Sequence, residues 1–274
     1  MLGTSAPDAR ALTTPPLRLD PLNAGAGATL LVGIDGPSLS SAGATPSSMV
    51  VALPRGTRLD PSAAARLCSG EQLSRGTCPA GSKVGFGRVV ESVAGFLAPG
   101  GETEVSWSIS AYLGVPAAPA DEASILLRAQ LLGADRVDQL LAPALGTDVP
   151  RVSLVRGRVV RRSSGSYGLE LRFTGFPGLL TAPGTVTAAP TRFELALGAV
   201  RRVREEFTRH IRVRTLHGYT TREIRDHRLV GHDLLRNPGT CRSSWPGELR
   251  LGFPGRVRRT AAPIGCTGEP LLAS

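Results

Sequence analysis

The stretch VSWSISAYLG (residues 105–114) alternates between apolar residues and small or polar ones, with Val105, Trp107, Ile109 and Ala111 on one side. This alternation is typical of a β-strand with one buried face, because successive side chains point to opposite sides of a sheet. We therefore interpret 105–114 as a strand that needs partners from elsewhere in the chain.

Further segments have the length and composition of strands, and Gly, Ser and Pro residues separate them. They are residues 28–34, 48–54, 84 onward, 124–133, 151–162, 166–176, 192–200 and 248–254. Short strands at this spacing predict an all-β protein, and we expect an antiparallel β-sandwich, Ig-like or related. A short helical turn is expected after Asp60, a good N-cap followed by Pro61.

The composition sets the expected domain organisation. Residues 1–27 are rich in Ala, Thr, Pro and Gly without periodicity, so we expect a flexible N-terminal segment. Residues 28–274 then form the β-sandwich unit, which the sequence also allows to be two related halves, 28–100 and 101–274. Apolar residues are 41% of the chain but aromatic residues only 4%, so the core must consist mainly of aliphatic side chains.

The net charge of +10 is concentrated in two segments. Lys83 is the only lysine, and this bias towards arginine together with abundant Ala, Gly and Pro is typical of a GC-rich genome, so the number of arginines is itself a weak signal. Residues 151–172 contain six arginines and Glu170, and residues 201–228 contain nine arginines and four acidic residues, so each segment has a net charge of +5. The position of these segments in the fold therefore matters more than the total.

The four cysteines form two local pairs, Cys68 with Cys78 and Cys241 with Cys266. Their spacings match no CxxC or zinc-binding pattern, so we expect two structural disulfides and no metal. Four cysteines allow three connectivities, of which we favour the local one. Disulfides indicate an oxidising compartment, so we expect an extracellular or cell-surface protein, although no signal peptide is visible at the start of the sequence.

Several short motifs resemble those of a loose group of exported, β-rich, disulfide-containing, uncharacterised proteins of high-GC Gram-positive bacteria. The matching pieces are LPRG at 53–56, Cys68, Cys78-Pro79, Val84-Gly85, FTGFPGLL at 173–180, and Asn237-Pro238 with Cys241. The resemblance implies a secreted β-sandwich and no particular activity. In such proteins the strand after Phe193 soon reaches the Asn-Pro-Cys segment, so residues 201–232 are interpreted as an insertion of this chain.

Residues 201–232 read RRVREEFTRHIRVRTLHGYTTREIRDHRLVGH and are predicted to form a long β-hairpin. A two-residue turn at His217-Gly218 is expected, because glycine readily adopts positive φ. The expected cross-strand pairs are Ile211–Ile224, Arg209–Asp226, Arg212–Glu223, Leu216–Tyr219 and Thr215–Thr220. One face then carries the candidate anion-binding residues His210, Arg212, Arg214 and Arg225.

All four histidines lie in this insertion, yet the sequence favours neither a metal site nor a catalytic site there. His227 and His232 are five residues apart, which places them on opposite faces of a strand, and arginines surround them. The chain has no Gly-x-Ser-x-Gly motif and no phosphate-binding glycine loop, so we expect no cofactor.

We therefore expect a non-enzymatic binding or structural protein that contacts an anionic cell-surface polymer. A hydrolase with an unrecognised site and a nucleic-acid-binding module are the alternatives left open. The second is disfavoured because Phe207 and Tyr219 are the insertion's only aromatic rings for base stacking.

Overall fold

The computed structural model describes residues 15–39, 44–94, 102–135, 137, 139, 149–176, 187–215 and 218–268. Most of the described strands belong to one 13-stranded sheet whose neighbours all pair antiparallel. Its order is β16 (Arg256–Ala261), β15 (Glu248–Phe253), β3 (Ser48–Pro54), β9 (Tyr167–Thr174), β8 (Val152–Arg161), β7 (Asp121–Leu131), β6 (Glu102–Gly114), β5 (Lys83–Ala94), β10 (Thr187–Leu197), β2 (Gly27–Asp35), β13 (Leu235–Arg236) and β4 (Arg58–Leu59), with β1 (Leu17–Asp20) also beside β2.

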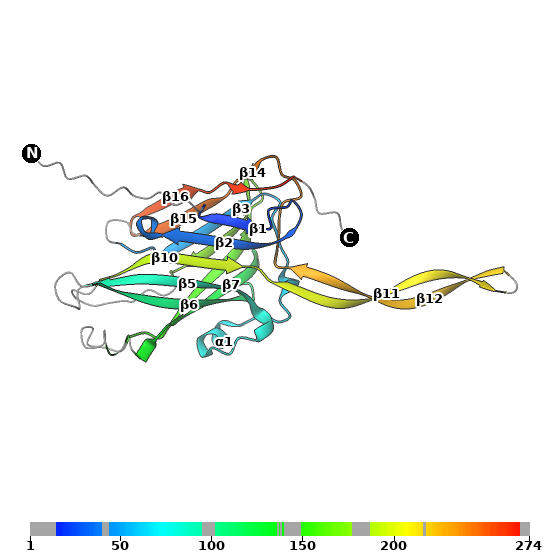
Figure 1. Ribbon diagram of the computed structural model, residues 1–274, viewed down its shortest axis with the longest axis horizontal. Helices are drawn as coiled ribbons and strands as arrows, with labels where there is room; N and C mark the ends of the chain where they lie inside the picture. Colours follow the sequence, from blue (N-terminus) through cyan, green and yellow to red (C-terminus); the bar gives the residue numbers. More distant parts are fainter. Residues whose placement is uncertain are drawn as a thin grey trace, which may run out of the picture.

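The expected all-β class is confirmed, whereas the two packed sheets of the expected sandwich are not shown. A sandwich needs two separate sheets, whereas here the long strands follow one another along a single path whose ends are not joined. Strands from 28–100 and from 101–274 are interspersed along that path. Figure 1 shows the sheet bending round on itself, with β5, β6 and β10 lying across the body from β3 and β15.

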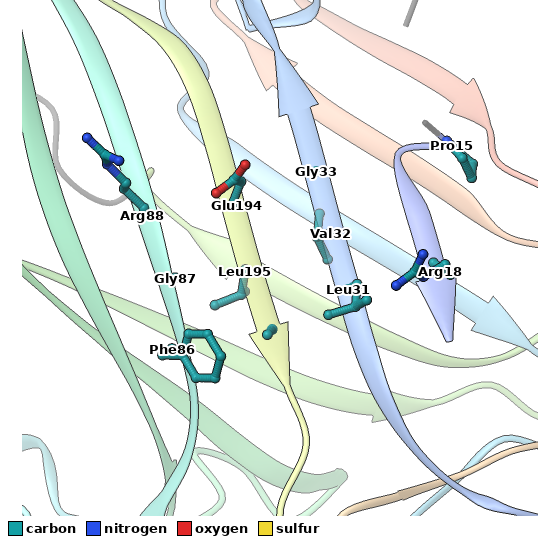
Figure 2. Close-up of a pocket in the computed structure, with 11 residues that line it drawn as sticks. Pro15, Arg18, Leu31, Val32, Gly33, Phe86, Gly87, Arg88, Glu194 and Leu195 are labelled. Carbon is teal, nitrogen blue, oxygen red and sulfur yellow. The ribbon is translucent and has the colours of Figure 1, made fainter. Parts of the chain in front are cut away.

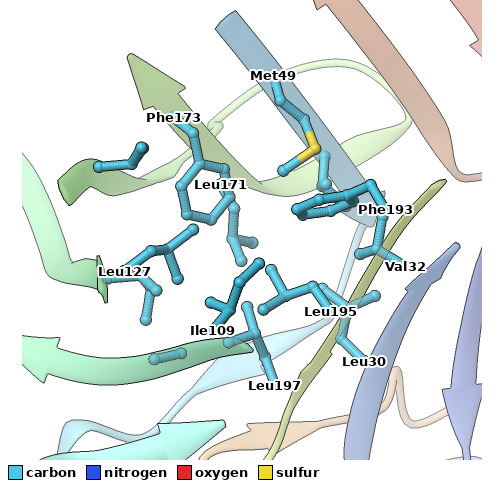
Figure 3. Packing of buried hydrophobic residues seen from close by; sticks show 14 of the residues in the cluster. Leu30, Val32, Met49, Ile109, Leu127, Leu171, Phe173, Phe193, Leu195 and Leu197 are labelled. Carbon is cyan, nitrogen blue, oxygen red and sulfur yellow. The ribbon is translucent and has the colours of Figure 1, made fainter. Parts of the chain in front are cut away.

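The curvature lets one face of the sheet bury itself. Val105, Trp107, Ile109 and Ala111 of β6 are all buried, as their alternation predicts. Figure 3 shows side chains of β2, β3, β6, β7, β9 and β10 converging on one centre. Phe176, just after β9, lies with its ring centroid 5.0 Å from that of Phe193 on β10, although four strands separate β9 from β10 along the sheet.

Smaller elements complete the body. They are α1 (Gly70–Arg75), the 3-10 turns η1 (Gly36–Ser38), η2 (Pro61–Ala63) and η3 (Ala80–Ser82), and the pair β14 (Ser244–Trp245) with β17 (Ile264–Gly265). The turn expected after Asp60 is η2, and the Asp60 side chain caps it by accepting from the Ser62 N–H. Within the segment 1–27, expected to be irregular, Leu17–Asp20 forms β1 because Leu17 and Leu19 bury against β2. No helix of the described residues is long and apolar enough to cross a membrane.

The predicted hairpin is present as a separate two-stranded sheet of β11 (Val200–Thr215) and β12 (Gly218–Asp233). We call residues 200–233 the arm, because Figure 1 shows them projecting from one end of the body. With about 3.3 Å per residue, strands of this length extend about 50 Å.

The predicted register of the hairpin is wrong by two residues. Gly218 pairs with Thr215 inside the ladder instead of forming the turn, and His217 lies outside the described residues. Ile211 therefore faces Arg222, and Arg209 faces Ile224. A shift of two residues leaves every side chain on its predicted face. It also places His210 opposite Glu223, whereas the predicted register would have placed it opposite Arg225.

The two disulfides connect the cysteines locally, as expected: Cys68 with Cys78, and Cys241 with Cys266. Such pairing indicates an oxidising, extracytoplasmic environment. The first disulfide encloses α1, and the second encloses β14, β15, β16 and β17, next to the edge of the sheet.

Because Arg75 separates the first pair and several arginines separate the second, a tryptic digest of the unreduced protein should contain two cross-linked peptide pairs, Cys68–Cys78 and Cys241–Cys266. The denatured, unreduced protein should take up no iodoacetamide, and the reduced protein should take it up at all four cysteines. Mass spectrometry checks both results. Alkylation before reduction, or a cross-link between the two pairs, would contradict the structure.

Candidate functional site

The arm is joined to the body at a polar cluster, the root, formed by Asp60, Ser62, Arg201 and His232. Nδ1 of His232 lies 2.9 Å from the Ser62 Oγ and 3.2 Å from Oδ2 of Asp60. Arg201 Nη1 donates to the Ser62 carbonyl oxygen over 3.3 Å. The backbone continues this connection, since Leu234 N–H donates to Ala199 O and Asp60 N–H donates to Leu234 O. The root therefore sets the direction in which the arm leaves the body.

A serine, a histidine and an aspartate meet at the root, but not in a catalytic arrangement. In a Ser–His–Asp triad the acid and the serine bind opposite nitrogens of the imidazole. Here both Ser62 and Asp60 contact the same nitrogen, Nδ1, and the Ser62 Oγ donates directly to Asp60 Oδ1 over 2.6 Å. The histidine cannot relay a proton between them, so the geometry is that of a structural clamp.

The carboxylate of Asp60 is held in its charged form. Partial burial raises its pKa, but the hydroxyl and N–H of Ser62, with His232, more than compensate, and the pKa falls below its ordinary value. The stability that this pKa shift contributes is therefore present above the ordinary Asp pKa of about 3.9 and is lost as the pH falls through the lowered one.

Along the arm, the three acidic side chains placed beyond the root each lie near a basic group of the arm itself. Arg225 lies 3.5 Å from Glu206, His210 lies 3.7 Å from Glu223, and Arg209 lies 3.6 Å from Asp226. These side chains are all largely exposed, so each pair contributes little. The nine arginines of residues 201–228 still outnumber the four acids, and the surplus of positive charge stays on the arm.

The register places the predicted anion-binding positions His210, Arg212, Arg214 and Arg225 on one face of the ribbon. The guanidinium of Arg212 lies over the ring of Tyr219, 5.0 Å from its centroid, while the side chain of Arg214 lies outside the described residues. Sequence reasoning missed two members of this face: the alternation along β11 adds Arg202 and Arg204, both exposed. Arg202 and Arg204 could have been identified from the sequence, because they occupy even-numbered positions of β11, as do His210 and Arg212.

The second basic segment, 151–172, has a different environment. Five of its six arginines have acidic partners: Arg151 with Asp135, Arg158 with Asp121, Arg161 with Glu122, and both Arg162 and Arg172 with Glu170. These pairs lie mainly on the outer face of the sheet, and the two segments that look alike in charge are therefore unlike in surroundings.

Glu170 is the most enclosed of these acids, with a side chain only 3% exposed. Arg172 donates to one oxygen at 2.5 Å and Arg250 donates to the other at 2.6 Å. Burial raises the pKa of Glu170, but these two guanidinium groups together lower it by more, so the net direction is down. The pKa of Asp121 is likewise lowered. The main cause is its hydrogen bonds from Arg158, which outweigh the opposite effect of burial.

Glu91 is a buried carboxylate that the sequence did not single out. It faces the core from β5 between Val89 and Val93, and Trp107 Nε1 donates to its Oε2 over 3.2 Å. A hydrolase with an unrecognised site would need two acids close together. Glu91, Asp121 and Glu170 are the buried acids of the described residues, and Asp121 and Glu170 are each held by arginines.

An apolar groove of about 510 Å³ crosses the outer face of the sheet from β5 to β1. Figure 2 shows Phe86 on β5, Leu31 on β2 and Arg18 on β1 along it, with β10 between β5 and β2. Phe86 is 68% exposed, and Gly33 leaves open space where a side chain would stand. The lining residues contain no Ser, Cys or His, and Glu194 is paired with Arg192 at 3.0 Å, so the groove offers a contact surface and no nucleophile.

In the described residues, no cluster of three or more His, Cys, Asp or Glu side chains could hold a metal ion. Comparisons of the chain with models of protein families, with curated proteins and with solved structures found no match. The resemblance to exported proteins therefore rests on the short sequence motifs alone. The arm, with its surplus of arginines, is the feature that points to a function.

Replacing His232 with Ala should loosen the root without unfolding the body. One net hydrogen bond contributes about 1 kcal/mol, so amide exchange at 200–203 and 230–233 should accelerate roughly 5-fold. Hydrogen exchange read by mass spectrometry checks this, with His227→Ala, an exposed position farther along the arm, as control. Equal exchange in the two variants would mean that the root does not hold the arm.

Proposed function

We propose that this chain is a non-enzymatic, extracellular or cell-surface binding protein whose arm contacts an anionic polymer. The observation that carries the proposal is the difference between the two basic segments: five of the six arginines of 151–172 have acidic partners in the body, whereas the arm projects from the body with a surplus of exposed arginines. A long basic ribbon presents repeated cationic groups over about 50 Å, and this suits a partner with repeated phosphate, sulfate or carboxylate groups. The disulfides support an extracytoplasmic site of action.

The arm's aromatic rings favour an acidic polymer of the cell surface over a single-stranded nucleic acid. Binding of single strands depends on rings that are free to stack with bases. Here Tyr219 lies under Arg212 and Phe207 lies under Arg228, with distances of 5.0 and 5.8 Å to the ring centroids. Both rings already contact a cation, so the arm is better suited to contacts with charge.

Binding to heparin, a sulfated polysaccharide used as a probe, should weaken by about tenfold when Arg204 and Arg212 are both changed to Ser. The slope of log affinity against log salt should also decrease by about 2, because two fewer cationic contacts release two fewer counterions. Titrations at several NaCl concentrations, read by fluorescence anisotropy, measure both quantities.

The matched control is Arg66→Ser with Arg242→Ser, which removes the same charge from exposed positions of the body. This variant should bind almost as tightly as the unchanged protein. Equal losses in both variants would show that net charge, and not the arm, determines binding. Tighter binding to double-stranded DNA than to heparin at the same salt would favour the nucleic-acid alternative.

A further inference from the structure

The outer edge of β12 has no neighbouring strand among the described residues. The His227 N–H points to this edge, where the carboxylate of Asp226 accepts it at 2.8 Å. Odd-numbered residues of β12 therefore direct their backbone groups outward. Such an edge is a template for another strand, and a ribbon of only two strands is marginally stable in water.

The side chains along this edge are arranged symmetrically about Ile224. Glu223 and Arg225 lie one residue away on either side, and Arg222 and Asp226 lie two residues away. Each charge thus has the opposite charge at the mirror position. Tyr219 and Leu229 lie five residues away on either side, and they are 63% and 72% exposed. Two large, mostly exposed side chains and two complementary charge pairs therefore share one centre.

We propose that β12 pairs antiparallel with β12 of a second copy of this chain, about a two-fold axis at Ile224. Residues equally distant from the axis then face one another. Arg222 faces Asp226 of the second copy, and Glu223 faces its Arg225, so symmetry produces four opposite-charge pairs. Tyr219 packs against Leu229 of the second copy, and this contact also occurs twice.

Neighbouring registers are excluded by charge. Moving the axis by one or two residues centres it on Arg222, Glu223, Arg225 or Asp226, each of which would then face its own like charge. The edge of β11 is less suitable: axes at Phe207 and Thr208, near its middle, place Arg212 opposite Arg202 or Arg204.

The length of the arm fits the same register. Gly218 lies opposite Val230 of the second copy, so the pairing ends just before His232, where the root begins. The result is a four-stranded ribbon with a body at each end. This inference does not require the proposed function, since the edge and its charges are present whether or not a polymer binds.

Charge reversal tests the register directly. Sedimentation velocity over a wide concentration range should show a reversible dimer of the unchanged protein. Glu223→Arg alone, or Arg225→Glu alone, should raise the dissociation constant roughly tenfold or more, because each sets like charges opposite one another. The double variant should restore the dimer. It does not restore the pairs within the arm, so the recovery reports only the contact between copies.

A cross-link gives a second, independent readout. In the proposed register Ile224 faces itself in a pair that is not hydrogen bonded, with Cα atoms about 4.5 Å apart, which a disulfide can span. Ile224→Cys should therefore form a covalent dimer on oxidation, and Thr208→Cys on β11 should not. A monomer at every concentration would overturn the proposal. So would a dimer that is insensitive to the single reversals, a double variant that stays monomeric, or equal cross-linking at both cysteines.

Discussion

The structure depends on burying one face of a single long sheet that no second layer covers in the part of the chain that the structure describes. With few aromatic residues, the chain must bring many aliphatic side chains together, and it does so by curling the sheet until strands far apart along its path face each other. The contact between Phe176 and Phe193 spans four intervening strands. Apolar burial contributes about 25 cal/mol per Å², so this shared interior is the main source of stability for the body.

The same constraint leaves the outer face of the sheet to polar and charged residues. There the arginines of 151–172 find acidic partners on neighbouring strands, and Glu170 connects β9 to β15 through Arg250. These arginines therefore have acidic partners close by. The arm projects away from the sheet, so its surplus arginines lie apart from those acids, and the proposed polymer contact and the proposed pairing of β12 both follow from that isolation.

Much of this could be predicted from the sequence, and the failures have physical reasons. Period-2 alternation identified the buried face of β6, and cysteine spacing identified both disulfides, because these are local signals. The curvature of the sheet depends on contacts between distant strands, so the strand pattern of the sequence could not distinguish one curled sheet from the two sheets of a sandwich. The arm's register was missed because Gly218 favoured a turn, whereas the pairing of His210 with Glu223 places it in the ladder. Glu91 lies among apolar neighbours and has no sequence pattern of its own, and its hydrogen bond from Trp107 is seen only in the folded chain.

The central claim is that the body is complete without the arm. It is tested most directly by shortening the arm: residues 204–229 are removed and Val203 is joined to Val230 through an Asn-Gly turn, which suits a two-residue hairpin. The free energy of unfolding, measured by denaturant titration, should then stay within about 1 kcal/mol of its original value, because the core and the root are unchanged. A much lower free energy of unfolding, or the loss of a single cooperative transition, would show that the arm is part of the fold and would contradict this account.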